Sequence, residues 1–182
     1  IEEIENPQVK DFFRLLYFET LSISRLPKRK FAEIWTKMLG HYTETVDQSI
    51  KTIERLKLNL GSAKIELGDA RELKLSDDAV SHIVTSPPYA IAIDYVVRNS
   101  EQLRLMGYSV KDIYGETIGL RGKGDLRIAN YYADLEQLIR EMHRVVEGGG
   151  YCVILIGDTQ YEKKTLPTIA RTISFAESCG FK

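Results

Sequence analysis

The chain has 182 residues, of which 43% are hydrophobic and 28% charged, a composition that suits one globular unit with a sizeable core. Its 25 basic and 26 acidic residues leave a net charge of −1, so the bulk charge does not indicate nucleic-acid binding, and any basic surface must be local. No apolar run approaches the roughly 18 residues of a membrane span, and the acidic residues 1–5 are unlike the basic start of a signal peptide.

Two helices are predicted at the start of the chain. Apolar side chains crowd residues 11–21 and leave little polar face, which predicts a largely buried helix. After Pro27, apolar residues from Phe31 to Leu56 keep the three-and-four spacing of a second, longer helix, with a bend expected near Gly40. We expect residues 1–60 to form an N-terminal helical segment that is packed on the following sheet or inserted before it.

Short apolar runs alternate with helical patterns from residue 61 onwards. Strands are predicted at residues 63–67, 81–85 and 151–156, the last being a near-continuous apolar run typical of a central parallel strand. Helical spacing falls at residues 95–106, 131–146 and 166–178. The alternation predicts an α/β fold with a mostly parallel, open sheet over residues 61–182, in which functional residues lie at the carboxyl ends of the strands.

The second predicted strand runs directly into Thr85-Ser86-Pro87-Pro88-Tyr89. Two adjacent prolines fix φ and donate no N–H, so the strand stops there and leaves carbonyl groups unpaired beside an aromatic ring. A planar amine fits such a place, because the Ser86 hydroxyl and the Pro87 carbonyl can accept its two protons while Tyr89 stacks on its ring. The alternative is a polyproline-like strand exit with no further role.

Gly68-Asp69-Ala70 follows the first predicted strand. The glycine permits a close turn, and the carboxylate of Asp69 can accept a hydrogen bond from an exocyclic amine such as N6 of adenine. The alternative is that Asp69 caps the helical turn that ends at Leu73. Because the carboxyl ends of neighbouring strands meet at one edge of a sheet, we expect Asp69 and Ser86 to lie near one another.

The motif Ser86-Pro87-Pro88-Tyr89 resembles the catalytic signature of S-adenosylmethionine-dependent amino-methyltransferases, which methylate exocyclic nitrogens of nucleobases. Residues 143–150 are similar to the Arg-Val-Leu-x-Pro-Gly-Gly connection frequent in methyltransferases, and their glycines predict a helix C-cap and turn. The resemblance implies a Rossmann-like, three-layer class I methyltransferase sheet. It also implies S-adenosyl-L-methionine as cofactor, with Asp69 and Ala70 at its adenine and with Ser86, Pro87, Pro88 and Tyr89 as the catalytic residues.

The reaction that this resemblance implies is methylation of an amino group of a DNA base. Cytosine N4 ranks ahead of adenine N6, because Ser at the first motif position is commonest among the N4 enzymes. The target base must be flipped or already unpaired, since its amine is engaged in a duplex. Two alternatives stay open: an RNA methyltransferase that acts on guanine N2 or another amine of transfer or ribosomal RNA, and a catalytically inactive binding module.

The chain departs from the family pattern in one respect. Nothing in it matches the glycine-rich Asp/Asn-Pro-Phe-x-Gly-x-Gly-Thr turn that holds the methionine part of the cofactor in these enzymes, and it stops where another strand is expected, which together predict a partial chain. Asn6-Pro7 resembles a Glu-x-Asn-Pro sequence that follows the second strand in relatives. That likeness makes Glu3 or Glu5 a candidate ribose ligand at a strand end.

The remaining polar residues are weaker candidates. Asp94-Tyr95 resembles a pair found in some relatives, which gives Asp94 a candidate active-site role, with Asn99 behind it. Gly119, Gly122 and Gly124 predict a flexible loop, a mobile substrate-facing loop being the alternative. Local basic surfaces, or plain solvated charge, are predicted at Arg25, Lys28, Arg29 and Lys30 and at Arg121, Lys123 and Arg127.

The cysteines and histidines carry no motif. Cys152 and Cys179 lack CxxC or CxxxH spacing, so neither a metal site nor a disulfide framework follows, and we expect a reducing, cytoplasmic setting. No shared spacing links the histidines, which we interpret as structural residues. They are His41, His82 and His143.

Overall fold

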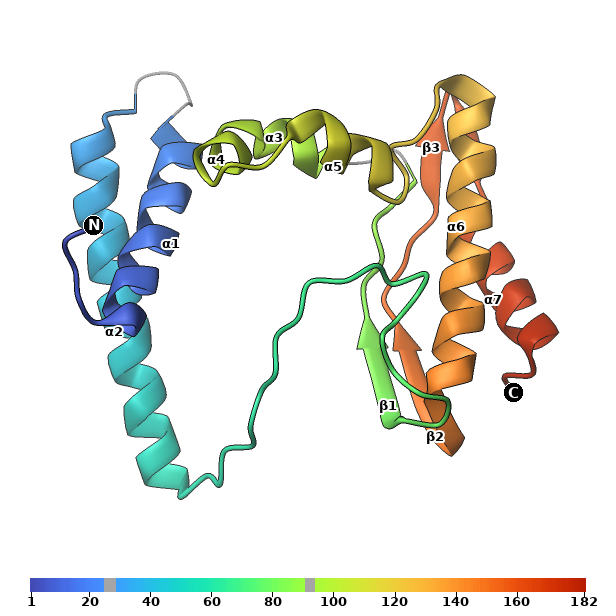
Figure 1. Ribbon diagram of the computed structural model, residues 1–182, viewed down its shortest axis with the longest axis horizontal. Coiled ribbons are helices and arrows are strands. Elements are labelled where there is room, and N and C mark those ends of the chain that lie inside the picture. The colour runs from blue at the N-terminus through green and yellow to red at the C-terminus, as the bar shows by residue number, and fades with distance from the viewer. Residues whose placement is uncertain (25–28, 91–93) are drawn as a thin grey trace. The chain divides into compact units, whose positions relative to one another are not determined.

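The computed structural model of the chain describes residues 1–24, 29–90 and 94–182 (Figure 1). Three residues of the sequence predictions, Arg25, Pro27 and Lys28, lie outside these described residues. The chain divides into two compact units, Ile1–Lys64 and Ile65–Lys182. The first unit holds two helices, and the second holds all the strands together with five further helices of the described residues.

The first unit is a pair of helices, α1 over Pro7–Ser24 and α2 over Phe31–Leu56, as predicted. Asn6 caps α1, because its side-chain oxygen accepts the N–H groups of Gln8 and Val9 at 3.0 and 3.1 Å, and Pro7 suits the first helical position since it has no N–H to satisfy. No strand precedes Asn6 among residues 1–6. The expectation that Glu3 or Glu5 ends a strand was therefore wrong, and Asn6-Pro7 is a helix start.

Aromatic rings fill the contact between α1 and α2. Phe13 stacks on Trp35 with ring centroids 6.2 Å apart, and the Tyr42 hydroxyl donates a hydrogen bond to Glu19. Leu16 on α1 is fully buried, but its neighbour Leu15 is 62% exposed. The prediction of a largely buried first helix is therefore correct for one face only, and α2 continues through Gly40 as a single helix.

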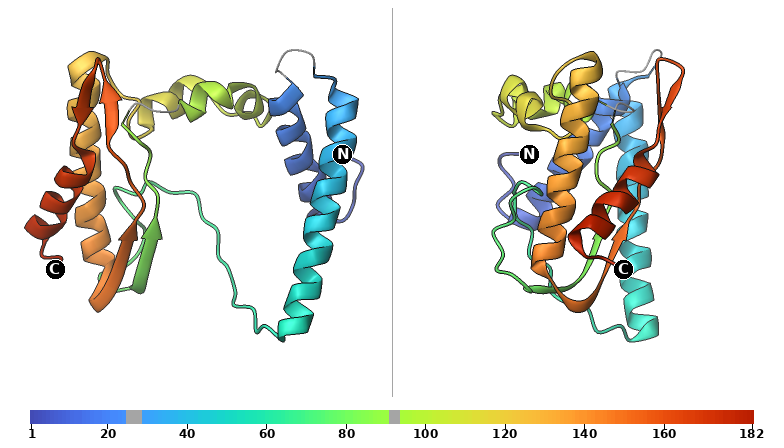
Figure 2. Two further views of the ribbon diagram at one scale, coloured as in Figure 1. Left: turned by 180° about the vertical axis from the view of Figure 1, so that it is seen from behind. Right: turned by 90° about the vertical axis from the view of Figure 1, so that its right-hand side faces the viewer.

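The second unit is built on two parallel strands, β1 over Val80–Thr85 and β2 over Val146–Ile154. Between them in the chain comes α6, Gly124–Val145, which covers one face of the pair (Figures 1 and 2). Helix α7, Thr168–Cys179, packs against α6. The centre of this core is formed by Ala90, Tyr131, Leu135, Leu138, Ile139 and Met142, with Ile83, Cys152 and Ile154 of the strands packed against it.

Shorter elements complete the second unit. The single helix predicted at residues 95–106 is divided at Asn99 into α3, Tyr95–Arg98, and α4, Ser100–Leu105, and these are followed by α5, Val110–Glu116. A hairpin of β3, Thr159–Tyr161, and β4, Lys164–Leu166, was not predicted. Its turn residues Glu162 and Lys163 have φ of +46° and +65°, which usually calls for Asn or Gly, so the sequence carries no hairpin signal there.

The strand predicted at residues 63–67 is absent, and this prediction was wrong. The segment is irregular, and its apolar side chains Ile65 and Leu67 are 95% and 92% exposed. An isolated strand gains no ladder hydrogen bonds, and no other segment in the described part of the chain pairs with this one. The fold is thus mixed α/β with a short, two-stranded parallel sheet, rather than the larger sheet that the alternating pattern predicts.

The glycines of residues 148–150 form a bulge in β2 instead of the predicted helix cap and turn. Helix α6 ends at Val145, β2 begins at once at Val146, and residues 147–150 stand opposite Ser81 alone in the parallel register. Gly150 lies so close to the neighbouring strand that a Cβ there would overlap the Ser81 carbonyl oxygen and lie 2.7 Å from Cγ2 of Val146. Glycine is therefore required at this position for steric reasons.

We expect Gly150→Ala to lower the free energy of unfolding by about 1–3 kcal/mol, because the added methyl group must push apart backbone atoms of paired strands. Gly148→Ala is the matched control, since nothing lies within 4 Å of a Cβ at that position. Its effect should stay within about 0.5 kcal/mol. Urea denaturation of both variants gives the two values, and equal losses would contradict the close approach of the strands at Gly150.

Candidate functional site

The predicted catalytic residues lie where β1 ends. The Thr85 carbonyl still accepts the N–H of Leu155 at 2.9 Å, so the parallel ladder closes one residue before Ser86. Ser86 is exposed, Pro87 is buried, Pro88 is half-buried and Tyr89 is 37% exposed. A hydroxyl group and an aromatic ring are thus both accessible at the carboxyl end of a parallel strand, which is where open α/β sheets place their ligands.

The backbone that follows the signature is supported by the loop of residues 117–123. Gly119, with φ of +83°, is buried against it, and a Cβ there would lie 3.4 Å from the Tyr89 carbonyl oxygen and 3.6 Å from that of Ala90. Beneath them lies Tyr131, whose side chain is fully buried. Burial, reinforced by the neighbouring Tyr132 and Tyr89, raises the pKa of Tyr131 to about 12, so the group is a neutral phenol.

Side chains fasten this glycine loop at two of its own carbonyl groups and at the carbonyl of Glu116, the last residue of α5. Arg127 Nε donates to the Gly119 oxygen at 2.6 Å, Asn130 Nδ2 to the Arg121 oxygen at 3.2 Å, and Arg71 Nη2 to the Glu116 oxygen at 3.0 Å. These hydrogen bonds tie the loop to Arg71 and to α6, while its flexibility stays a prediction. Two residues of the predicted basic surface bind groups of the chain itself: Arg127 binds the Gly119 carbonyl, and Arg121 binds Asp134.

Asp69 begins a tight turn that is closed by Arg71. Its carboxylate accepts the Arg71 backbone N–H at 2.9 Å and is gripped by the same side chain, with Nε at 2.9 and 3.1 Å from the two oxygens and Nη2 at 2.7 Å. These hydrogen bonds hold the pKa of Asp69 below its ordinary value. The carboxylate is therefore an ionised acceptor, and the turn geometry of the cap-like alternative is present as well.

One cavity is lined by chain neighbours of both predicted motifs, although neither Asp69 nor any of the residues 86–89 is among its lining residues. Ala70, which follows Asp69, and Thr85, which precedes Ser86, both line this cavity of about 360 Å³. Its other walls are mostly apolar: Leu73, Leu75, Val80, His82, Ile83, Val84, Leu138, Met142 and Val145. A flat ring suits such a lining better than a phosphate group does.

Asp134 of α6 is the functional candidate that the sequence reasoning missed. Its side chain is only 3% exposed, and its Oδ1 receives Nη1 of Arg71 at 2.8 Å as well as Nη2 of Arg121. Its Oδ2 is buried and has no hydrogen-bond partner in the described part of the chain, as is true of the Tyr131 and Tyr132 hydroxyls. The signal was available, because Asp134 falls on the same helical face as Tyr131, Leu135 and Leu138, where a charge must find a partner.

Several weaker candidates have structural roles. Asp94 caps α3 by accepting the N–H of Val97 at 2.9 Å, and Asn99 separates α3 from α4. The ring of His143 meets Phe181 edge-on with centroids 5.1 Å apart. Burial raises the pKa of the Cys152 thiol, which disfavours a reactive thiolate.

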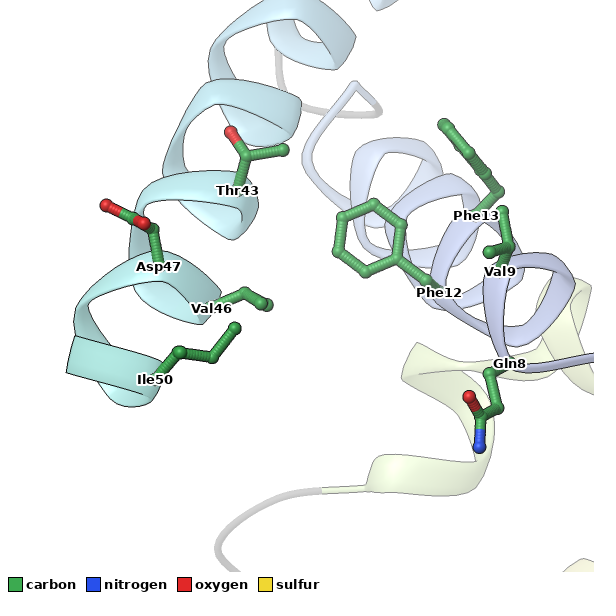
Figure 3. Close-up of a pocket in the computed structure, with 8 residues that line it drawn as sticks. All are labelled: Gln8, Val9, Phe12, Phe13, Thr43, Val46, Asp47 and Ile50. Atoms are coloured by element: carbon green, nitrogen blue, oxygen red, sulfur yellow. The ribbon is translucent and has the colours of Figure 1, made fainter. Parts of the chain in front are cut away.

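The first unit contains a separate apolar groove of about 540 Å³ between α1 and α2 (Figure 3). Phe12 of α1 and Val46 of α2 point towards each other across it. The lining also includes Gln8, Val9, Phe13, Thr43, Asp47 and Ile50. None of the residues predicted to act in catalysis or cofactor binding lines this groove.

Comparison with known proteins gave no relative. No family model matches the chain, and neither do the curated proteins or the solved structures with which it was compared. Within residues 1–24, 29–90 and 94–182, no helix combines the length and apolar character needed to cross a membrane. The same residues hold no cluster of three or more His, Cys, Asp or Glu side chains able to bind a metal ion.

We expect Asp134→Asn to lower the free energy of unfolding by about 3 kcal/mol, because two guanidinium groups lose their shared buried anion. The matched control is Glu136→Gln on the same helix, whose ion pair with Arg140 is largely exposed. That change should cost less than about 1 kcal/mol. Chemical denaturation measures both, and similar losses for the two variants would show that the Asp134 cluster has no special role in stability.

Proposed function

We propose that the protein is an S-adenosylmethionine-dependent methyltransferase of an exocyclic amino group in DNA, with cytosine N4 ahead of adenine N6. The observation that carries the proposal is the cavity lined by both Ala70 and Thr85, the residues that adjoin Asp69 and the exposed Ser86 in the chain. Asp69 precedes Ala70 in the chain and Ser86 follows Thr85, so a carboxylate acceptor and a hydroxyl acceptor each adjoin a residue that lines the cavity. The exposed ring of Tyr89 follows Ser86 three positions later. These are the groups that the transfer of a methyl group to a base amine needs.

The residues present fit the acceptor amine and the adenine part of the donor. An amine conjugated to a base ring is a poor nucleophile because its lone pair is delocalised, and the Ser86 hydroxyl and Pro87 carbonyl improve it by accepting its protons. Tyr89 offers a face on which the base stacks. When bound, S-adenosylmethionine supplies the electrophilic methyl group, and Asp69, ionised and partly exposed, is the group that would accept the amine of its adenine.

The proposal includes a Rossmann-like, three-layer methyltransferase fold for residues 61–182. Parallel pairing of β1 with β2, with α6 between them in the chain, is a βαβ unit of the kind that Rossmann-like methyltransferase sheets repeat. The face of this pair that α6 does not cover carries exposed apolar side chains: Val84, Tyr151 and Val153. Parallel sheets are ordinarily covered on both faces, which supports a three-layer arrangement for residues 61–182, preceded by the helical residues 1–60.

One observation favours a second candidate, an inactive binding module. The chain holds no match to the glycine-rich turn of the methionine site, and Arg71 already occupies the Asp69 carboxylate. Such a module keeps the cavity and the stacking ring but transfers no methyl group. It differs from the enzyme in two measurable respects, since it neither binds the methyl donor nor transfers a methyl group.

We expect Ser86→Ala to lower the rate of methyl transfer on the order of 100-fold while the dissociation constant for S-adenosylmethionine stays within about twofold, because Ser86 contacts the acceptor amine. Ser178→Ala, a change at an exposed serine on α7, should alter neither quantity. Asp69→Ala should show the opposite pattern, with donor binding weakened about tenfold. The measurements are transfer of tritium from labelled donor to DNA and calorimetric titration.

These assays also decide between the candidates. Label that enters transfer or ribosomal RNA but not DNA would replace the DNA proposal by the RNA methyltransferase. Absence of any donor binding in calorimetry would leave the inactive module. If Ser86→Ala impaired donor binding and Asp69→Ala impaired only transfer, the two residues would have been assigned to each other's roles.

A further inference from the structure

Arg71 is the residue that connects the two halves of the proposed site. Besides its three side-chain contacts with the Asp69 carboxylate, it donates Nη1 to Asp134 Oδ1 at 2.8 Å and Nη2 to the Glu116 carbonyl at 3.0 Å. Its side chain is 13% exposed. Every nitrogen of the guanidinium therefore donates a hydrogen bond, and the contacts with Asp69 and with Asp134 together fix the orientation of its plane.

Asp134 provides the fixed end of this arrangement. It stands on α6, the longest helix of the second unit, among fully buried residues such as Tyr131 and Leu135. Because an isolated buried charge is costly, Asp134 must keep both Arg71 and Arg121. The result is an alternating row of charges, from Asp69 through Arg71 and Asp134 to Arg121.

The exposed side of Asp69 remains open to a ligand. Its side chain is 46% exposed, in contrast to the 13% of Arg71 that covers its other side. A carboxylate has about four lone-pair positions. Three N–H donors of Arg71 already bind it, from the backbone N, Nε and Nη2, which leaves room for about one further donor. The fork of Arg71 thus presents the carboxylate in one orientation rather than merely neutralising it.

Arg71 also reaches the acceptor half of the site. Its contact with the Glu116 carbonyl lies at the start of the loop that places Gly119 against the Tyr89 and Ala90 carbonyl oxygens. A rigid helix, a buried anion and one arginine therefore support both Asp69 and the backbone behind Tyr89. Sites that require accurate geometry are built in this way, on supporting hydrogen bonds from regular elements.

We propose that Arg71, anchored by Asp134, is a positioning residue that orients Asp69 towards the amine of an adenine ring and holds the loop behind Tyr89 in place. The inference rests on the proposed function for the identity of the ligand. It adds that recognition of the adenine amine depends on a residue that does not touch it. The connection from Arg71 to the loop belongs to the free protein and needs no ligand.

The test compares two probes, S-adenosylhomocysteine and its analogue in which the purine lacks the exocyclic amine. The unaltered protein should bind S-adenosylhomocysteine about tenfold more tightly, the value expected for one hydrogen bond to a charged group. In Arg71→Lys this preference should fall to about twofold or less, since an ammonium group cannot form the fork. Arg140→Lys is the control, because Arg140 forms an exposed ion pair on α6, and it should keep the full preference.

Two results would overturn the positioning role. If Arg71→Lys weakened both probes equally, Arg71 would act only on the general structure. If the affinities for both probes were unchanged, Asp69 would be oriented without Arg71. Asp69→Asn guards against a folding defect, because it leaves the pairing of Arg71 with Asp134 intact. It should lower the preference by itself.

A measurement on the free protein separates this inference from the proposed function. Amide hydrogen exchange of residues 117–120 should be about tenfold faster in Arg71→Lys than in the unaltered protein or in Arg140→Lys, because the loop loses its contact at Glu116. Unchanged exchange would refute the connection to the loop. Failure of the unaltered protein to bind either probe would refute the proposed function, while the exchange result would still decide the role of Arg71 in the loop.

Discussion

A charged face on α6 is the constraint on which the second unit depends. Residues 69–79 form almost no regular structure, and yet they lead into β1 at a defined place because α6 holds them at two points. Asp134 binds Arg71 at one point. At the other, Arg144 donates to the carbonyl groups of Leu73 and Leu75, while Glu141 accepts the Leu73 N–H at 2.7 Å. Side chains of α6 therefore form hydrogen bonds with backbone groups of this segment that a neighbouring strand would otherwise pair.

This mode of attachment explains which parts of the fold could be predicted from the sequence. Periodicity identified α1, α2, α7 and the centre of β1, since the spacing of apolar residues in each of these elements is a local property of the sequence. It failed at residues 63–67, where the apolar alternation is that of a strand but no neighbouring strand pairs with it. The glycines of residues 148–150 predict a turn instead of the observed bulge. The sequence cannot indicate the bulge locally, because the requirement for glycine at position 150 comes from the Ser81 carbonyl on another strand.

The candidate site also contains some residues that the local sequence predicts and others that only the tertiary structure brings together. Ser86 and Tyr89 were predictable because one local rule, the end of a parallel strand at two prolines, fixes their position. Arg71 and Asp134 are 63 positions apart and meet only after α6 has packed on β1, so no local pattern joins them. Their absence from the sequence reasoning reflects the fact that charged residues are ordinarily solvated, and that a buried pair is recognised from its partner and not from its own neighbours.

The contact of Arg71 with Asp69 admits two interpretations, and electrostatics decides between them. A carboxylate that had to leave its arginine before accepting a ligand would lose the strong interaction first and gain a weaker one, which would oppose binding. A carboxylate that accepts while still held needs no reorganisation, and its lowered pKa keeps it ionised at and well below neutral pH. Because the Asp69 side chain is 46% exposed while Arg71 holds it, the second interpretation fits the geometry. The arginine then prepares the acceptor instead of competing for it, as preorganised polar sites require.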